Sequence, residues 1–238
     1  MIKALSTKHQ TLSNQQALSH RHCSRMSQTI VVIDYGLGNL RSVSKAVEHV
    51  AEAGDRVLVT DRPELIRGAD RIVFPGQGAA RDCMAALSDH HLNQAVLEAA
   101  RGKPFLGICM GLQVLLEFSE ENGGTPLLGL ISGQVRRFPE GLDGHGQRLK
   151  IPQMGWNRVH QTKPHPLWAG IPDDSRFYFV HSYYVAPLDP SLTVGATQHG
   201  ITYASALARD NLFAVQFHPE KSADHGLQLL RNFLHWTP

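Results

Sequence analysis

The sequence predicts an α/β fold, in which a doubly wound, mostly parallel sheet is flanked by helices and continues into an additional antiparallel strand region. Two patterns predict it. In the first half, short apolar runs alternate with stretches of helical period, as in parallel strands joined by helices. The second half contains strand-like runs separated by turn residues, which is typical of antiparallel pairing. The 238-residue chain shows no internal repeat and no linker, so one core is expected.

The first strand is predicted at 29–34, TIVVID, because a continuous β-branched run is typical of a strand buried on both faces. A helix is predicted at 39–54, with Gly54 at its end. Its apolar side chains share one helical face: Leu40, Val43, Val47 and Val50. Further strands of the parallel part are predicted at 56–60, 71–74 and 104–108.

The second half is predicted to hold five strands, at 133–138, 176–185, 192–198, 201–208 and 211–218. A final helix is predicted at 223–236, because Leu227, Leu230 and Leu234 fall on one of its faces. Residues 29–238 are therefore expected to form a single domain.

The first 28 residues differ from the rest in composition. They carry four basic residues and no acidic one, and they show no sustained apolar period. Such a segment buries too little apolar surface to offset the entropy of ordering, so it is expected to be disordered. It resembles a transit peptide superficially. An upstream start codon, with Met26 as the natural first residue, is the explanation we favour.

Composition excludes several classes of protein. Beyond residue 28 the chain has 19 basic and 21 acidic residues, which gives no basic field for nucleic acid. No apolar run approaches the roughly 20 residues that cross a bilayer. The three cysteines, Cys23, Cys83 and Cys109, form neither a disulfide framework nor a metal-binding pair. A reducing compartment, the cytoplasm, is expected, without metal or cofactor.

The stretch FLGICMGLQ (105–113) places Cys109 between a strand and a predicted helix at 110–118. This is the strand–nucleophile–helix elbow, with cysteine as the nucleophile and glycines on both sides to relieve crowding. A helix that begins at the nucleophile also favours the thiolate form of a cysteine. The alternative is that Cys109 is simply a small buried apolar side chain.

Two further stretches fit the same chemistry. In AVQFHPEKS (214–222), His218 and Glu220 are two apart in extended backbone, so the carboxylate can orient the imidazole. In FPGQGAA (74–80), a Pro-Gly loop directly after a strand exposes backbone N–H groups that could hold an oxyanion. Each has a plain alternative, a surface turn for the first and an ordinary strand–helix turn for the second.

These three stretches, in this order, resemble the class I (triad) glutamine amidotransferases, whose fold is flavodoxin-like. Three more stretches resemble one branch of that class, the glutaminase subunits of imidazole glycerol phosphate synthases: IDYGLGNLRSV (33–43), KIPQMGWN (150–157) and YFVHSYY (178–184). The resemblance covers the chain from Thr29 to its C-terminus.

The resemblance implies a role for each matching residue. Cys109 would attack the side-chain amide of L-glutamine and form a glutamyl thioester, with His218 as acid and base and Glu220 as its orienting partner. The Gly78 region and the amide of Met110 would bind the oxyanion. Three further residues would hold the α-amino and α-carboxyl groups of the substrate glutamine: Gln113, Ser182 and Tyr183.

The resemblance also implies a partner. The ammonia would pass to a separate cyclase subunit with a (β/α)8 barrel fold. This cyclase would form a heterodimer with the glutaminase and make imidazole glycerol phosphate and aminoimidazole carboxamide ribotide in histidine biosynthesis. Four residues match stretches that face this partner: Asn39, Trp156, Tyr184 and Lys221. The alternatives are that Trp156 and Tyr184 are core aromatics and that Lys221 is a solvated charge.

Two positions depart from the family pattern in the oxyanion loop, where Gln77 and Ala80 replace the common valine and phenylalanine of PGVGAF. Met110 and Leu112 are exchanged relative to the common CLGMQ, which conserves volume. Two other functions remain open from the residues alone. One is a glutaminase that serves pyridoxal phosphate, anthranilate or guanylate synthesis, and the other is a non-catalytic binding module of the same fold.

Overall fold

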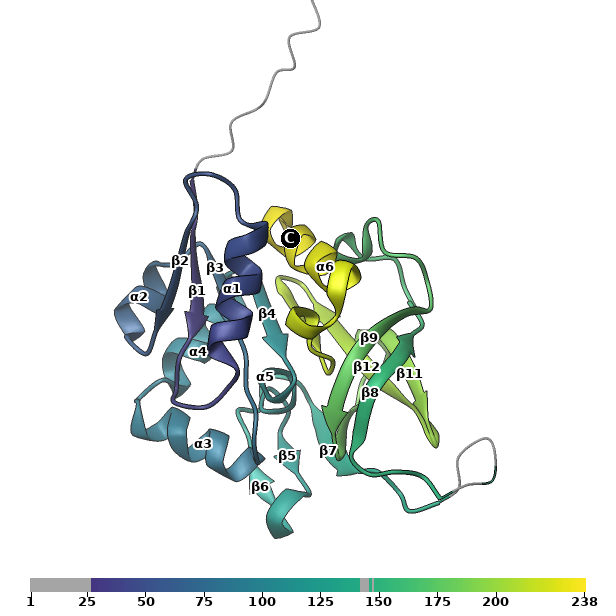
Figure 1. Cartoon of the computed structure of the whole chain (residues 1–238). Coiled ribbons are helices and arrows are strands. Elements are labelled where there is room, and N and C mark those ends of the chain that lie inside the picture. The colour runs from purple at the N-terminus through teal and green to yellow at the C-terminus, as the bar shows by residue number, and fades with distance from the viewer. Residues whose placement is uncertain (1–26, 142–145, 147) are drawn as a thin grey trace, which may run out of the picture.

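The structure is a computed structural model that describes residues 27–141, 146 and 148–238. The prediction of disorder for the first 28 residues therefore lies almost entirely outside the described residues. The described part forms one sheet with helices on both faces, and a smaller two-stranded sheet beside it (Figure 1). Across these residues, no helix has both the length and the apolar character needed to span a membrane.

Five parallel strands form the first half of the main sheet, in the order β2-β1-β3-β4-β13. Their bounds are β1 Thr29–Ile33, β2 Arg56–Thr60, β3 Arg71–Phe74, β4 Phe105–Ile108 and β13 Leu212–Val215. All four residues of β3, β4 and β13 are buried, which explains why, apart from Arg71, their sequences are apolar. The doubly wound, mostly parallel sheet is confirmed.

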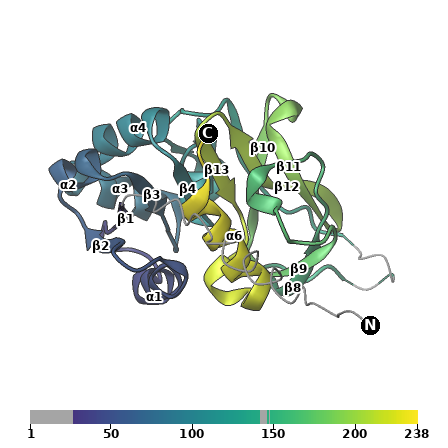
Figure 2. The same cartoon turned by 90° about the horizontal axis from the view of Figure 1, so that it is seen from above.

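Two apolar clusters cover the two faces of this sheet. Val31 and Ile33 of β1 point into one cluster, whereas Ile30 and Val32 point into the other, as alternation along a strand requires. The first face is covered by α2 (Pro63–Gly68), α3 (Ala80–Asp89) and α4 (Asn93–Gly102), and the second by α1 (Leu40–Val50) and α6 (Ala223–His235). Figure 2 shows these two helical layers on opposite sides of the sheet.

The second half of the chain extends the sheet from β13 in the order β12-β10-β7-β5-β6, with β11 also paired to β12. Most of these pairings are antiparallel, and β5 with β7 is parallel. The strands are β5 Phe118–Ser119, β6 Thr125–Pro126, β7 Gly133–Arg137, β10 Tyr183–Pro187, β11 Thr193–His199 and β12 Ile201–Arg209. Single 3-10 turns connect some elements: η1 Glu121–Gly123, η2 Pro166–Trp168, η3 Pro190–Leu192 and η4 Pro219–Lys221.

The prediction of a single strand at 176–185 is wrong. It consists of β9 (Ser175–His181) and β10, and the chain changes sheets at Ser182. β9 pairs with β8 (Gln153–Val159) in the small sheet, whereas β10 pairs with β7 and β12 in the main sheet. β8 has no counterpart among the predicted strands. At the break, the carbonyl of Ser182 accepts a hydrogen bond from the N–H of Phe138 at 3.1 Å.

Two helices are shorter than predicted. α1 ends at Val50, because Ala51 is extended and the side chain of Asp55 accepts a hydrogen bond from the N–H of Glu52 at 3.2 Å, which forms a turn before Gly54. The helix predicted at 110–118 is the single turn α5 (Met110–Gln113). The carbonyls that would continue α5 accept hydrogen bonds from the N–H groups of 128–131 instead.

Candidate active site

Cys109 lies at a strained turn between β4 and α5. Its backbone has φ 55° and ψ −109°, a conformation that non-glycine residues rarely adopt and that is often found at functional sites. Its N–H donates to the carbonyl of Val215 in β13 at 2.8 Å. A Cβ on Gly111 would overlap the carbonyl oxygen of Phe74 in β3, so this glycine is required for the close approach of α5 to the sheet.

His218 and Glu220 lie where β13 ends. Nδ1 of His218 is 2.9 Å from Oε1 of Glu220, and the two side chains are 6% and 1% exposed. Burial alone would lower the pKa of His218, but its interactions with Cys109 and Glu220 outweigh burial and raise that pKa to about 10. Nε2 has no hydrogen-bond partner within the described residues. It is therefore free to exchange a proton with a substrate.

The register of two neighbouring strands brings nucleophile and base together. β4 and β13 are parallel and pair Ile108 with Val215, so Cys109 and the segment that leads to His218 leave the same edge of the sheet. The N–H of His218 is held by the carbonyl of Tyr178 in β9 at 2.9 Å. The predicted triad is thus assembled at the carboxyl ends of two central strands, the usual place for a site in such a sheet.

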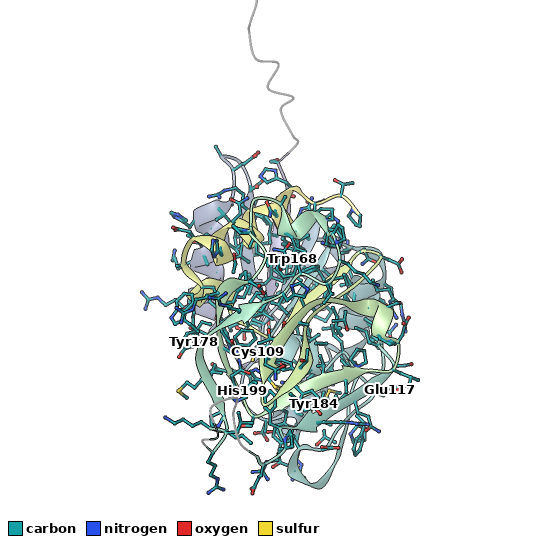
Figure 3. All side chains as sticks on the ribbon, turned by 90° about the vertical axis from the view of Figure 1, so that its right-hand side faces the viewer. Cys109, Glu117, Trp168, Tyr178, Tyr184 and His199 are labelled. Atoms are coloured by element: carbon teal, nitrogen blue, oxygen red, sulfur yellow. The ribbon has the colours of Figure 1, made fainter. Side chains whose placement is uncertain are left out.

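A cavity of about 590 Å³ opens above Cys109. Eight of the predicted residues line it: Gly78, Cys109, Met110, Gln113, Ser182, Tyr183, His218 and Lys221. Such a volume accommodates a small polar substrate such as an amino acid. Seen from the side of β8 and β9, Cys109 lies in the interior of the molecule (Figure 3), and it is 5% exposed.

The loop predicted to bind the oxyanion borders the same cavity through Gln77 and Gly78. The carbonyl of Gln77 accepts a hydrogen bond from the thiol of Cys83 at 3.5 Å, and the carbonyl of Pro75 accepts one from the hydroxyl of Tyr35 at 3.0 Å. Gly78 has φ 92°, which favours glycine. Within the described part of the chain, the backbone N–H groups of Gly78 and Met110 have no hydrogen-bond partner.

Gln113 and Tyr183 contact each other beside the nucleophile. The side-chain amide of Gln113 donates to the carbonyl of Tyr183 at 3.1 Å and to Oε1 of Gln216 at 2.9 Å. Gln216 in turn donates to the sulfur of Cys109 at 3.7 Å. The sequence reasoning missed Gln216, although its spacing of two from His218 could have indicated that both face the same side of an extended segment.

The four residues predicted to face a partner lie in different settings. Trp156, on β8, is 45% exposed and packs edge-on against Tyr178, over whose ring Lys221 lies at 5.8 Å. Tyr184 is partly buried and packs against Phe138 with ring centroids 5.1 Å apart. Asn39 precedes α1 and is partly buried. Trp156 and Lys221 therefore share one surface through Tyr178.

The sequence matches known proteins along most of its length. The family model described as glutamine amidotransferase class-I matches residues 31–236. A protein of Methylococcus capsulatus, named imidazole glycerol phosphate synthase subunit HisH, is 60% identical over 212 residues, which is 88% of this chain and 97% of that protein. A protein of the same name from Dechloromonas aromatica is 59% identical over 214 residues, covering 89% and 98%.

The chain belongs to the HisH family of class I glutamine amidotransferases. This membership argues against a glutaminase that serves another synthase. Solved structures agree with the fold. PurLQS from Thermotoga maritima has a TM-score of 0.66 at 18% identity, covering 88% of this chain and 99% of that one. A glutamine amidotransferase from the same organism has a TM-score of 0.54 at 16% identity, covering 84% and 80%.

Proposed function

We propose that this HisH family member is the glutaminase subunit of an imidazole glycerol phosphate synthase. It would hydrolyse L-glutamine to glutamate and ammonia and supply the ammonia to a cyclase subunit in histidine biosynthesis. The observation that carries the proposal is the buried Cys109–His218–Glu220 arrangement at the floor of a cavity. A binding module needs no such arrangement, so a non-catalytic role is disfavoured.

The first half of the reaction transfers the acyl group to sulfur. His218, held in its charged form by Glu220 and the sulfur, stabilises a thiolate on Cys109. The sulfur attacks the side-chain carbonyl carbon of glutamine, and the tetrahedral intermediate carries an oxyanion. The imidazolium gives its proton to the departing nitrogen, the C–N bond breaks and ammonia leaves. A glutamyl thioester on Cys109 and a neutral His218 remain.

The second half hydrolyses the thioester. Neutral His218 takes a proton from a water molecule as its oxygen attacks the thioester carbon, and the sulfur leaves as thiolate. Glutamate is released and the thiolate–imidazolium pair is restored. Both tetrahedral intermediates place negative charge near the elbow, where the N–H groups of Met110 and Gly78 are the proposed donors.

Glutamine is proposed to bind between α5 and the start of β10. Both donor hydrogens of the Gln113 amide point to protein acceptors, so its Oε1 is left to accept from the α-ammonium group of the substrate. Ser182 and Tyr183 line the same cavity and would hold the α-carboxylate. The polar ends of the substrate are thereby fixed while its side-chain amide reaches Cys109.

The partner is proposed to be a (β/α)8 cyclase that forms a heterodimer with this chain through the outer face of β8 and β9. Met154 and Trp156 expose 66% and 45% of their surface there, with Tyr178 and Lys221 beside them. An exposed apolar pair bordered by a charge is typical of a protein interface. We place the complex in the cytoplasm, since Cys83 and Cys109 are both free thiols.

The test is glutamate release by this chain, measured alone, with the cyclase of a related synthase, and with that cyclase and its ribotide. We expect slow release alone and a sharp rise with both additions. Equal or absent release under all three conditions would contradict the proposal. A cyclase that makes product from added ammonium salt but not from glutamine would locate the failure in this chain.

A further inference from the structure

A row of two side chains, those of Gln113 and Gln216, joins the backbone of β10 to the nucleophile. Gln113 Nε2 lies 3.1 Å from the carbonyl of Tyr183 and 2.9 Å from Oε1 of Gln216, and Gln216 Nε2 lies 3.7 Å from the sulfur of Cys109. Gln216 is fully buried and Gln113 is 2% exposed. No step of the reaction described above uses Gln216.

The direction of each amide in this row follows from its fixed end. A backbone carbonyl only accepts hydrogen bonds, so the Gln113 atom that faces Tyr183 has to be the nitrogen. That same nitrogen faces Gln216, which therefore presents its oxygen to Gln113. The remaining amide group of Gln216, its NH2, faces the sulfur of Cys109. The orientation of a backbone carbonyl in β10 is thus transmitted to the nucleophile.

The row is also held in place at both ends. The carbonyl of Tyr183 accepts a second hydrogen bond from Nδ1 of His181 at 2.7 Å. The N–H of Gln216 donates to the carbonyl of Ser205 in β12 at 2.9 Å. In addition, the N–H of Cys109 is bonded to Val215, the residue before Gln216. The short segment from Val215 to His218 therefore controls the backbone of Cys109, its sulfur and its base.

We infer that Gln216 is a positioning residue for both Cys109 and Gln113. Its NH2 group holds the sulfur on the side of the cavity and stabilises the thiolate over the thiol, because an N–H donor interacts more strongly with a charged acceptor. Its oxygen fixes the Gln113 amide so that Oε1 of Gln113 faces the substrate. The second of these roles rests on the proposed function, whereas the first concerns the cysteine alone.

The other titratable groups that interact with the sulfur come from three elements. His218, next to η4, supplies the positive charge. Tyr35 follows β1 and Cys83 belongs to α3, and burial raises the pKa of both, that of Cys83 to about 11. These two remain neutral near pH 7, so neither places a negative charge beside the sulfur.

The test is the rate of alkylation of Cys109 by iodoacetamide as a function of pH, followed by mass spectrometry of the Cys109 peptide so that other cysteines do not contribute. Gln216→Met keeps the volume and removes both hydrogen bonds. We expect the midpoint of its profile to rise by about one pH unit, because the charged sulfur loses a hydrogen-bond donor. Gln161→Leu is the control, because it also removes the hydrogen bonds of a glutamine side chain, here to two backbone carbonyls, but Gln161 lies outside the site.

A midpoint equal to that of the wild type would overturn the proposed role of Gln216 at Cys109, because the loss of a merely structural residue would leave the alkylation midpoint unchanged. If Gln216→Met does not fold, Gln216→Glu has nearly the same shape and places a carboxylate oxygen against the sulfur, so its midpoint has to rise as well. The role toward Gln113 predicts a KM for glutamine about tenfold higher in the complex with cyclase, and an unchanged KM would overturn it. Absence of glutaminase activity in the wild type would contradict the proposed function while the alkylation result still stands.

Discussion

Nδ1 of His218 and Oε1 of Glu220 are 2.9 Å apart in an environment almost closed to solvent. Oε2 of the same carboxylate has no hydrogen-bond partner within the described residues. The imidazole is therefore the main compensation for a buried negative charge, and the carboxylate in turn holds the imidazole in its charged form. This mutual dependence predicts that Glu220 is needed for catalysis although it does not line the cavity.

Replacing this carboxylate tests its role directly. Glu220→Gln keeps a hydrogen-bond acceptor but removes the charge, so the imidazolium is less stable and the thiolate is formed less often. We expect kcat for glutamine to fall about 10- to 100-fold, as expected for a charge-assisted hydrogen bond of about 1.5–3 kcal/mol. Synthesis from added ammonia should be unchanged. Glu98→Gln, at an exposed ion pair on α4, is the control and should retain full activity.

The raised pKa of His218, about 10, also predicts how stability depends on pH. The native state binds this proton more tightly than the unfolded state, in which histidine titrates near pH 6.5. The proton on His218 therefore makes its full contribution to the free energy of unfolding below about pH 6.5. This contribution is lost as the pH rises toward 10. The free energy of unfolding of the wild type should fall relative to His218→Gln over this window, in denaturant titrations at successive pH values. A constant difference would contradict the assigned pKa direction.

Partly buried His165 and buried His181 do not disturb that measurement. Burial lowers the pKa of each to about 4, so both are neutral in the native state across the window. Their effect on the free energy of unfolding has the opposite sign and occurs at acid pH. The stability that depends on their remaining neutral is present above about pH 6.5 and is lost as the pH falls toward 4.

The close packing of the elbow predicts a large effect at Gly111. A Cβ at this position would overlap the backbone carbonyl of Phe74, which cannot move without disturbing β3. Gly111→Ala should therefore lower the free energy of unfolding by about 3 kcal/mol or more. Gly102→Ala, at the end of α4 where a Cβ meets nothing within 4 Å, is the matched control. Equal stabilities of the two variants would show that the elbow is less tightly packed than described.

The exposed face of β8 predicts a loss of partner binding. Trp156→Ala should weaken affinity for the cyclase by about 2 kcal/mol or more, as expected for a central aromatic residue of an interface. Because Trp156 is 45% exposed in the free chain, its own stability should change by less than about 0.5 kcal/mol. Leu188→Ala, at a residue 78% exposed outside β8 and β9, serves as control. Calorimetric titration with the cyclase measures the affinity of both variants. Equal affinities of the Trp156→Ala and Leu188→Ala variants would place the interface elsewhere.

The parallel half of the fold could be predicted because its central strands are buried on both faces and their sequences are almost continuously apolar. The change of sheet at Ser182 could not be predicted, because 176–185 stays extended on both sides of it and only the identity of the neighbouring strand changes. The early end of α5 has a similar cause. Its sequence fits a helix, but the carbonyls of the next turn pair with a later segment of the chain.

The proximity of the three proposed triad residues could be predicted because they stand directly after a strand or two apart in extended backbone. The structure brings Cys109, His218 and Glu220 together as that reasoning requires. The same spacing of two places Gln216 on the side of His218, but a single glutamine at such a position carries no catalytic motif. Its significance depends on which backbone carbonyl lies at the far end of its hydrogen-bonded row.

The most direct test of the mechanism is Cys109→Ala in the complex with cyclase, supplied in parallel with glutamine and with an ammonium salt. If Cys109 forms the thioester, the variant makes no imidazole glycerol phosphate from glutamine but uses ammonia at the wild-type rate, because the cyclase and the interface are intact. Glutamine-dependent synthesis that persists in the variant would contradict the assignment of the nucleophile.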